Sequence, residues 1–206
     1  MKIAHLYKPV LGHSHLRNAV VLLMGIGLSD AAHAAGQNIE RGIGAAAGIF
    51  AGIYVHELGH ATAFRAAGAE QVRIRVPGPQ CALLCGQTDA QWTGALSPAT
   101  LRGISVAGFL ASNLASEVVL RHEPAARSGF GQGFVATNLY SNVMHVATYY
   151  TRVRGRNGYR GNDIDTFEMA GGNPHLLSAG LVAYSLYAVQ RARKKGIPIV
   201  FVGGHF

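Results

Sequence analysis

The stretch that decides the fold is residues 52–63, GIYVHELGHATA, which places His56, Glu57 and His60 in the pattern His-Glu-x-x-His. On a helix, side chains four positions apart leave the same face, so the two imidazoles can bind one metal ion, and this pattern favours zinc. Glu57 projects beside the pair, where a carboxylate can accept a proton from activated water and return it to a leaving group. The motif therefore predicts a hydrolytic zinc site with Glu57 as its catalytic base.

The flanks of the motif indicate a membrane environment. Residues 42–55, GIGAAAGIFAGIYV, carry no charge, and the run after His60 stays apolar or small until Arg65. A segment of about 20 mostly apolar residues is long enough to cross a bilayer. Ionisable groups inside such a segment are costly, which favours a functional role for them. We expect a helix over residues 42–67 that ends at Gly68.

The core His-Glu-Leu-Gly-His-Ala at residues 56–61, its Gly- and Ala-rich apolar helix and a later aspartate resemble the site-2 protease family of intramembrane zinc metalloproteases. The likeness covers the organisation of residues 42–190 and is close only in the core. It implies a polytopic helical membrane protein that hydrolyses peptide bonds within or near the membrane. It also implies that the third metal ligand is an aspartate on a late segment.

Two histidines leave a catalytic zinc site incomplete, because three protein ligands are usual. The glutamates far enough downstream are Glu117, Glu123 and Glu168. None of them stands in a suitable context, whereas residues 160–174, RGNDIDTFEMAGGNP, offer the aspartate that the resemblance implies. We expect Asp163 to be the ligand, with Asp165 as the alternative, although Gly161 precedes Asp163 where the family has a glycine after its aspartate. Asp163 would also suit the N-cap of a short helix.

Composition and charge favour a membrane protein. Of the 206 residues, 49% are apolar and 14% are charged, against about 25% charged residues in soluble domains. The formal charge of +8 comes from basic residues between apolar runs and at the tail, as expected of anchors at anionic headgroups. No basic stripe carries interleaved aromatics, which argues against nucleic acid. We expect membrane lipid and a peptide or membrane-protein substrate as partners, and a multi-pass location in the bacterial inner membrane.

The chain divides into an N-terminal segment at residues 1–36, a metallopeptidase core at residues 37–190 and a basic C-terminal tail at residues 191–206. The N-terminal segment has a basic start, a short apolar run and an A-x-A pattern at residues 32–34. It is therefore either a cleaved secretory signal or a retained first membrane helix. Residues 37–41 are expected to form a short polar connection to the motif helix.

The expected fold is mainly α, a polytopic membrane helix bundle with a short β-hairpin inserted after the motif helix. Residues 71–76, QVRIRV, alternate apolar and basic side chains, which is the period of a strand. The resemblance implies that such a strand aligns extended substrate, and a simple surface hairpin is the alternative. Residues 86–102 are polar and predict a loop. Further apolar helices are expected at residues 103–120, 132–150 and 175–190.

Polar residues inside these helices offer further candidates for the site. Asn138, Asn142 and His145 fall on one helical stripe, and polar groups in membrane helices face inward. They can form interhelical hydrogen bonds, as we expect for Asn138, or be donors aimed at substrate, for which Asn142 and His145 are second candidates. Asn113 and Glu117 also share a face, either toward the interior or with Glu117 near the headgroups.

Two other features leave alternatives open. Cys81 and Cys85 can form a disulfide in an oxidising compartment or be two small buried side chains, and without further cysteines or a nearby histidine they do not favour a second metal site. The whole chain also fits a soluble secreted zincin with a cleaved signal peptide. A third possibility is a non-catalytic membrane protein with structural or absent zinc.

Overall fold

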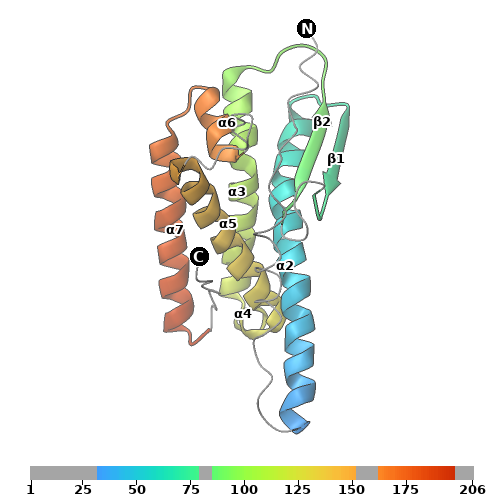
Figure 1. Ribbon diagram of the computed structural model, residues 1–206, viewed down its shortest axis with the longest axis vertical. Helices are drawn as coiled ribbons and strands as arrows, with labels where there is room; N and C mark the ends of the chain where they lie inside the picture. Colours follow the sequence, from blue (N-terminus) through green and yellow to red (C-terminus); the bar gives the residue numbers. More distant parts are fainter. Residues whose placement is uncertain (1–31, 79–84, 152–161, 198–206) are drawn as a thin grey trace.

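The computed structural model describes residues 32–78, 85–151 and 162–197, and its described part is mainly helical with one two-stranded hairpin (Figure 1). The expectation of a mainly α fold with a hairpin after the motif helix is confirmed. In chain order the elements are α2 (Ala32–Ala66), β1 (Gln71–Arg75), β2 (Gln87–Gln91), α3 (Pro98–Arg121), α4 (Glu123–Arg127), α5 (Gly129–Thr151), α6 (Asp163–Met169) and α7 (Pro174–Lys194). The choice between a signal and a retained helix for residues 1–36 rests largely on residues 1–31, outside the described part.

The helix that carries the motif, α2, is longer than expected. It begins at Ala32, so the polar connection predicted at residues 37–41 is wrong and that segment is helical. Gln, Glu and Arg are good helix formers, and the segment contains neither Gly nor Pro to stop the helix. The start of α5 also packs on it, because a Cβ at Gly129 would lie 2.2 Å from the Arg41 carbonyl oxygen. The predicted end holds: α2 stops at Ala66, just before Gly68, which has a φ of 87°.

Helix α3 starts five residues before its expected position. The Ser97 hydroxyl accepts a hydrogen bond from the Thr100 amide at 3.1 Å, and Pro98 follows at the first helical position. An N-cap serine followed by proline is a strong start signal, which the apolar pattern alone did not indicate.

Helix α7 continues through the basic run to Lys194, so part of the predicted tail at residues 191–206 is helical. The reason is tertiary, because Arg191 forms an ion pair with Glu117 of α3. The Lys195 ammonium also donates to the Leu120 carbonyl oxygen at 3.0 Å. Glu117 thus faces a partner inside the bundle, with 18% of its side chain exposed.

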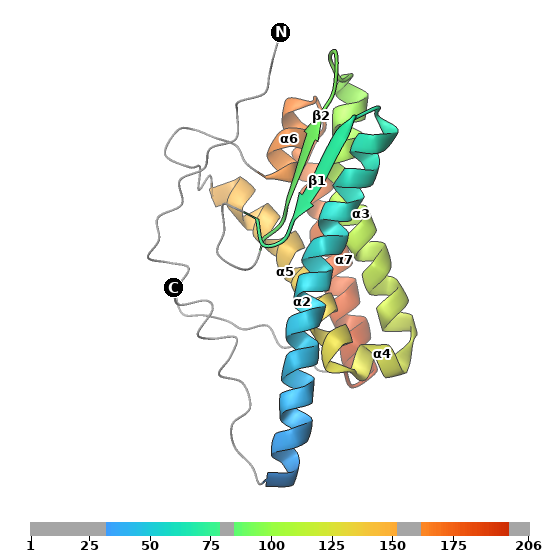
Figure 2. The same cartoon turned by 90° about the vertical axis from the view of Figure 1, so that its right-hand side faces the viewer.

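The hairpin pairs β1 with β2 in antiparallel register, with Arg73 opposite Asp89. The expected strand at residues 71–76 is confirmed for Gln71–Arg75. The loop predicted at residues 86–102 is wrong for Gln87–Gln91, which is polar throughout apart from one alanine and becomes a strand by pairing with β1. Figures 1 and 2 both show the hairpin alongside the C-terminal half of α2. It therefore lies next to the motif.

The helices approach one another closely because small residues stand at their crossings. A Cβ at Gly48 of α2 would lie 2.0 Å from the Phe130 carbonyl oxygen of α5, and one at Gly59 would lie 2.3 Å from the Ala107 carbonyl oxygen of α3. Neither position has room for a side chain. Small residues at helix crossings are typical of packing between membrane helices.

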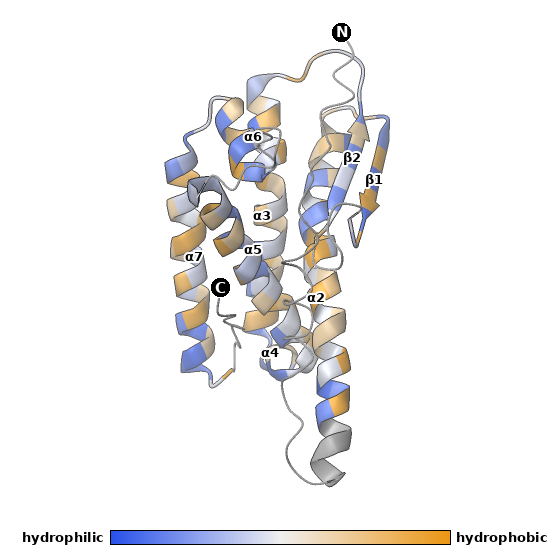
Figure 3. Cartoon of the chain, in the orientation of Figure 1, coloured by the Kyte–Doolittle hydropathy of each residue, from blue (hydrophilic) through white to orange (hydrophobic). Residues whose placement is uncertain are grey.

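Helix α3 buries small polar side chains among the apolar core and exposes large apolar ones on another face. Along α3, Ser112 and Ser116 are buried at 1% and 0% exposure, whereas Leu114 and Val118 are 66% and 68% exposed. Figure 3 shows apolar residues along α3 and α7 and a hydrophilic lower end of α7. Within the described residues only α3 is long and apolar enough to cross a membrane, so the expectation of several spanning helices is not supported by length and composition.

Candidate metal centre

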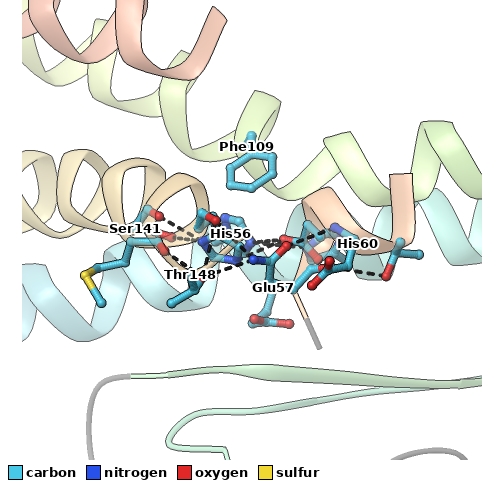
Figure 4. A network of polar contacts seen from close by, with 12 residues as sticks. His56, Glu57, His60, Phe109, Ser141 and Thr148 are labelled. Carbon is cyan, nitrogen blue, oxygen red and sulfur yellow. Dashed lines mark hydrogen bonds and ion pairs between the residues drawn. The ribbon is translucent and has the colours of Figure 1, made fainter. Parts of the chain in front are cut away.

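The two motif histidines face each other through their Nε2 atoms, as their spacing on α2 predicts. The Nε2 atoms of His56 and His60 lie 3.1 Å apart, and both side chains are 9% exposed (Figure 4). The Nδ1 of His60 lies 2.8 Å from the Ile104 carbonyl oxygen. Because a carbonyl can only accept, this Nδ1 carries the hydrogen and directs Nε2 at His56. When the ring is neutral, this contact leaves the lone pair on Nε2, the state in which His60 can bind a metal.

Asp163 joins the pair from the far end of the chain. Its Oδ2 lies 3.0 Å from His56 Nε2 and 3.2 Å from His60 Nε2. Asn162 caps α6 by accepting from the Asp165 amide, so the capping role considered for Asp163 falls to its neighbour. Ile164, fully buried beside Phe109, anchors this short helix to α3. The carboxylate is therefore held in place by the packing of the next residue along α6.

These three residues form a group that can hold a metal ion. Among the described residues they alone offer His, Cys, Asp or Glu ligand atoms that all lie within 4.8 Å of one another. Ligand atoms around a tetrahedral zinc are about 3.3 Å apart, as follows from metal–ligand distances of about 2.0–2.2 Å. The observed separations of 3.0, 3.1 and 3.2 Å are a few tenths of an ångström shorter. Acceptor atoms this close need a cation or a shared proton between them.

The electrostatics of the cluster favour an ionised Asp163. Burial alone would raise the pKa of this carboxyl, but the charge of His60 and hydrogen bonds from His56 and His60 hold it well below its usual value. The carboxylate is therefore ionised at neutral pH, the state in which it can bind a metal.

Helix α3 forms one wall of the cluster through Gly108 and Phe109. A Cβ at Gly108 would lie 2.4 Å from His60 Nε2 and 2.7 Å from His56 Nε2. The ring of Phe109 packs edge-on against His56 with centroids 5.2 Å apart. Gly108 thus leaves the space in front of the two nitrogens free.

Substitution of Gly108 by Ala is expected to reach the metal centre without touching a ligand. The added methyl group pushes both nitrogens aside, so we expect metal affinity to fall by about 10- to 100-fold, as for other changes next to the ligands. Competition with a chelating dye measures the affinity. Gly103→Ala on the same helix is the matched control, because a Cβ there meets nothing within 4 Å. Equal affinities of the two variants would contradict this account of the wall.

Glu57 is 8% exposed and is held by the hairpin. The Thr88 hydroxyl of β2 lies 2.7 Å from Glu57 Oε2 and 3.0 Å from the Glu57 carbonyl oxygen. Gly86 lies against the same side chain, since a Cβ there would be 2.2 Å from Glu57 Cγ. The Glu57 side chain is drawn toward the hairpin in Figure 4. The hairpin therefore covers the carboxylate and supplies its hydrogen-bond partner.

The remaining candidates fall into two groups. Asp165, the alternative ligand, lies outside the metal group although it is only two positions from Asp163. Asn138 donates to Ser112 and Ser116 of α3, which confirms the interhelical role expected for it. Asn142 also forms interhelical hydrogen bonds. It donates to Asn113 of α3 at 3.0 Å and to Ser185 of α7 at 3.3 Å.

The other candidates include one residue beside the cluster. His145 lies next to it, with Nε2 3.4 Å from Asp163 Oδ2. Of the cysteines, Cys85 has no free thiol and Cys81 lies outside the described residues.

Sequence reasoning missed the residues that shape the surroundings of the motif. Gly108 and Phe109 lie in a run that is apolar on nearly all sides. Its hydropathy therefore does not indicate which face of the helix contacts the cluster. Thr88 and Gly86 lie in a segment without apolar alternation, so no pattern indicated that they approach Glu57. The one available signal was the glycine content of the helices, which indicates close approach but not the partner.

Comparisons with family models, with curated proteins and with solved structures found no match. The class of the protein therefore rests on its own geometry, a helical bundle with a hairpin and a buried His-His-Asp cluster beside a glutamate.

Proposed function

We propose that the protein is a zinc-dependent peptidase of the membrane, similar in its chemistry to the site-2 protease family. The observation that carries the proposal is the meeting of His56, His60 and Asp163, drawn from positions more than 100 residues apart, next to Glu57. Two nitrogens and one oxygen suit zinc, and three protein ligands leave one position for water. When bound, zinc would polarise the scissile carbonyl and lower the pKa of water, so that the water loses a proton readily and becomes a better nucleophile.

The residues of this chain would divide the remaining work. His56, His60 and Asp163 would hold the metal, and the Ile104 carbonyl would keep His60 in its ligand tautomer. Glu57 would accept a proton from the attacking water and pass it to the leaving amine. Its carboxylate must turn from Thr88 toward the cluster to do so, since Oε2 accepts a hydrogen bond from the Thr88 hydroxyl. The hairpin would then adjust as substrate enters.

Metal analysis of the purified protein tests the proposed cofactor. We expect about one zinc per chain, and we expect a chelator to abolish hydrolysis of a peptide library in detergent micelles. Readdition of zinc restores the activity if removal of the metal was the cause. Protein that is folded but contains no stoichiometric metal after growth with added zinc would overturn the proposal.

The proposed membrane location rests on the outward apolar faces of α2 and α3. Outward apolar side chains recur at helical spacing on α3 at Leu110, Leu114 and Val118, and on α2 at Phe50 and Tyr54. The same bundle buries serines and asparagines that bond between helices. Large exposed apolar surfaces on a soluble monomer are rare, whereas inward polar residues and outward apolar ones are expected in lipid. We therefore propose that the apolar faces of α2 and α3 contact lipid.

Alkaline carbonate extraction tests this location. Lipid-facing apolar surface holds a protein in the bilayer when ionic contacts are removed, so we expect the chain in the membrane pellet and its release only by detergent. A peripheral protein of the same preparation is the control and should wash off. Recovery of the chain in the carbonate supernatant would support the alternative of a soluble secreted zincin.

A further inference from the structure

His145 of α5 stands beside the metal group, with its Nε2 directed at Asp163. Its Nδ1 lies 2.8 Å from the Ser141 carbonyl oxygen, which can only accept, so Nδ1 carries the hydrogen. In this tautomer the nitrogen that can bind a metal is Nε2, and this atom lies 3.4 Å from Asp163 Oδ2. The side chain is 24% exposed. His145 therefore has the tautomer and the direction of a metal ligand.

The rings have the spacing expected for imidazoles that share one metal. Two histidines bound through nitrogen at a tetrahedral angle have ring centroids about 5.2 Å apart, given zinc–nitrogen distances of about 2.0–2.1 Å. The centroids of His56 and His60 are 4.9 Å apart, and those of His56 and His145 are 5.6 Å apart. Phe109 packs edge-on against both His56 and His145, at 5.2 and 4.9 Å. One aromatic ring thus positions both.

The backbone at His145 is tied to the residue before Asp163. The Asn162 amide donates to the His145 carbonyl oxygen and to the Thr148 hydroxyl, each at 3.0 Å. The same Asn162 caps the helix that begins with Asp163. Asp163 and His145 are therefore placed by one hydrogen-bonded unit.

We propose that His145 is a fourth, exchangeable protein ligand, so that the metal of the substrate-free protein is bound by three histidines and Asp163. The proposal rests on the metal centre proposed above. His145 lies outside the group whose ligand atoms are all within 4.8 Å of one another, so its ring must swing inward to bind. A catalytic zinc site keeps one position for water, and His145 is then the ligand that gives up its place.

X-ray absorption of the zinc-loaded protein counts the imidazoles at the metal and needs no substrate. We expect three imidazoles and one oxygen ligand in the wild type, and two imidazoles in His145→Ala. His175→Ala is the matched control, because this exposed histidine on α7 pairs with Tyr150 instead of the cluster. Two imidazoles in the wild type would overturn the proposal, whether or not any variant folds. The same count in the wild type and in folded His145→Ala would overturn it too.

Zinc affinity gives an independent readout and separates this proposal from the proposed function. We expect His145→Ala to bind zinc at least about 10-fold more weakly than the wild type, the lower end of what loss of a group next to a metal costs. His145→Asn controls for lost hydrogen bonding and should be as weak. Three imidazoles without any peptidase activity would support the fourth ligand and overturn the proposed function. A wild type that binds no metal overturns both.

Discussion

Replacement of Glu57 by Gln is expected to slow peptide hydrolysis by at least about 100-fold and to leave the metal in place. The amide is nearly the size of the carboxylate, and its oxygen can still accept a hydrogen bond from the Thr88 hydroxyl, which lies 2.7 Å from Oε2. It cannot take a proton from water. General base catalysis contributes about 10²- to 10⁴-fold to rates, so we expect a loss of that size in hydrolysis of the peptide library.

The control for this variant is Glu40→Gln, which changes an exposed glutamate of the same helix. It should keep full activity, zinc content and thermal midpoint. Glu57→Gln should match it in zinc content, measured by mass spectrometry of the metal. Full activity in Glu57→Gln would support a non-catalytic protein with structural zinc, because hydrolysis would then come from a contaminant.

Replacement of Asp163 by Ala is expected to remove the metal. The change deletes the one anionic ligand and leaves two buried nitrogens 3.1 Å apart. Loss of a partner outside the ligand sphere costs about 10- to 100-fold in metal affinity, and loss of a ligand should exceed that range. We therefore expect zinc binding to weaken by more than about 100-fold in competition with a chelating dye, with hydrolysis lost at limiting zinc.

Asp165→Ala is the matched control, since it removes a carboxylate two positions along α6 that lies outside the metal group. Its zinc affinity should stay within a few fold of the wild type. Asp163→Asn keeps the side-chain shape and separates charge from packing. A larger loss in Asp165→Ala than in Asp163→Ala would show that the wrong aspartate had been chosen.

Local sequence patterns predicted the elements with a clear motif, a clear alternation or a clear helix-ending glycine. The His-Glu-x-x-His spacing needs only helix geometry to bring His56 and His60 together, and their nitrogens do meet. Alternation predicted β1, and glycine after Ala66 predicted the end of α2. The helical state of residues 37–41 and the start of α3 were missed because hydropathy does not record the packing of α5 at Arg41 or the serine cap.

What the sequence alone determined is the chemistry of α2, with two imidazoles and an acid on one helical segment, because residue spacing on a helix is a local property. Only the tertiary structure decided which aspartate lies beside them, which glycine leaves them room, and that Thr88 and His145 are their neighbours. Those contacts join residues 18 to 107 positions apart. Such contacts depend on how helices pack, and no spacing along the chain encodes them.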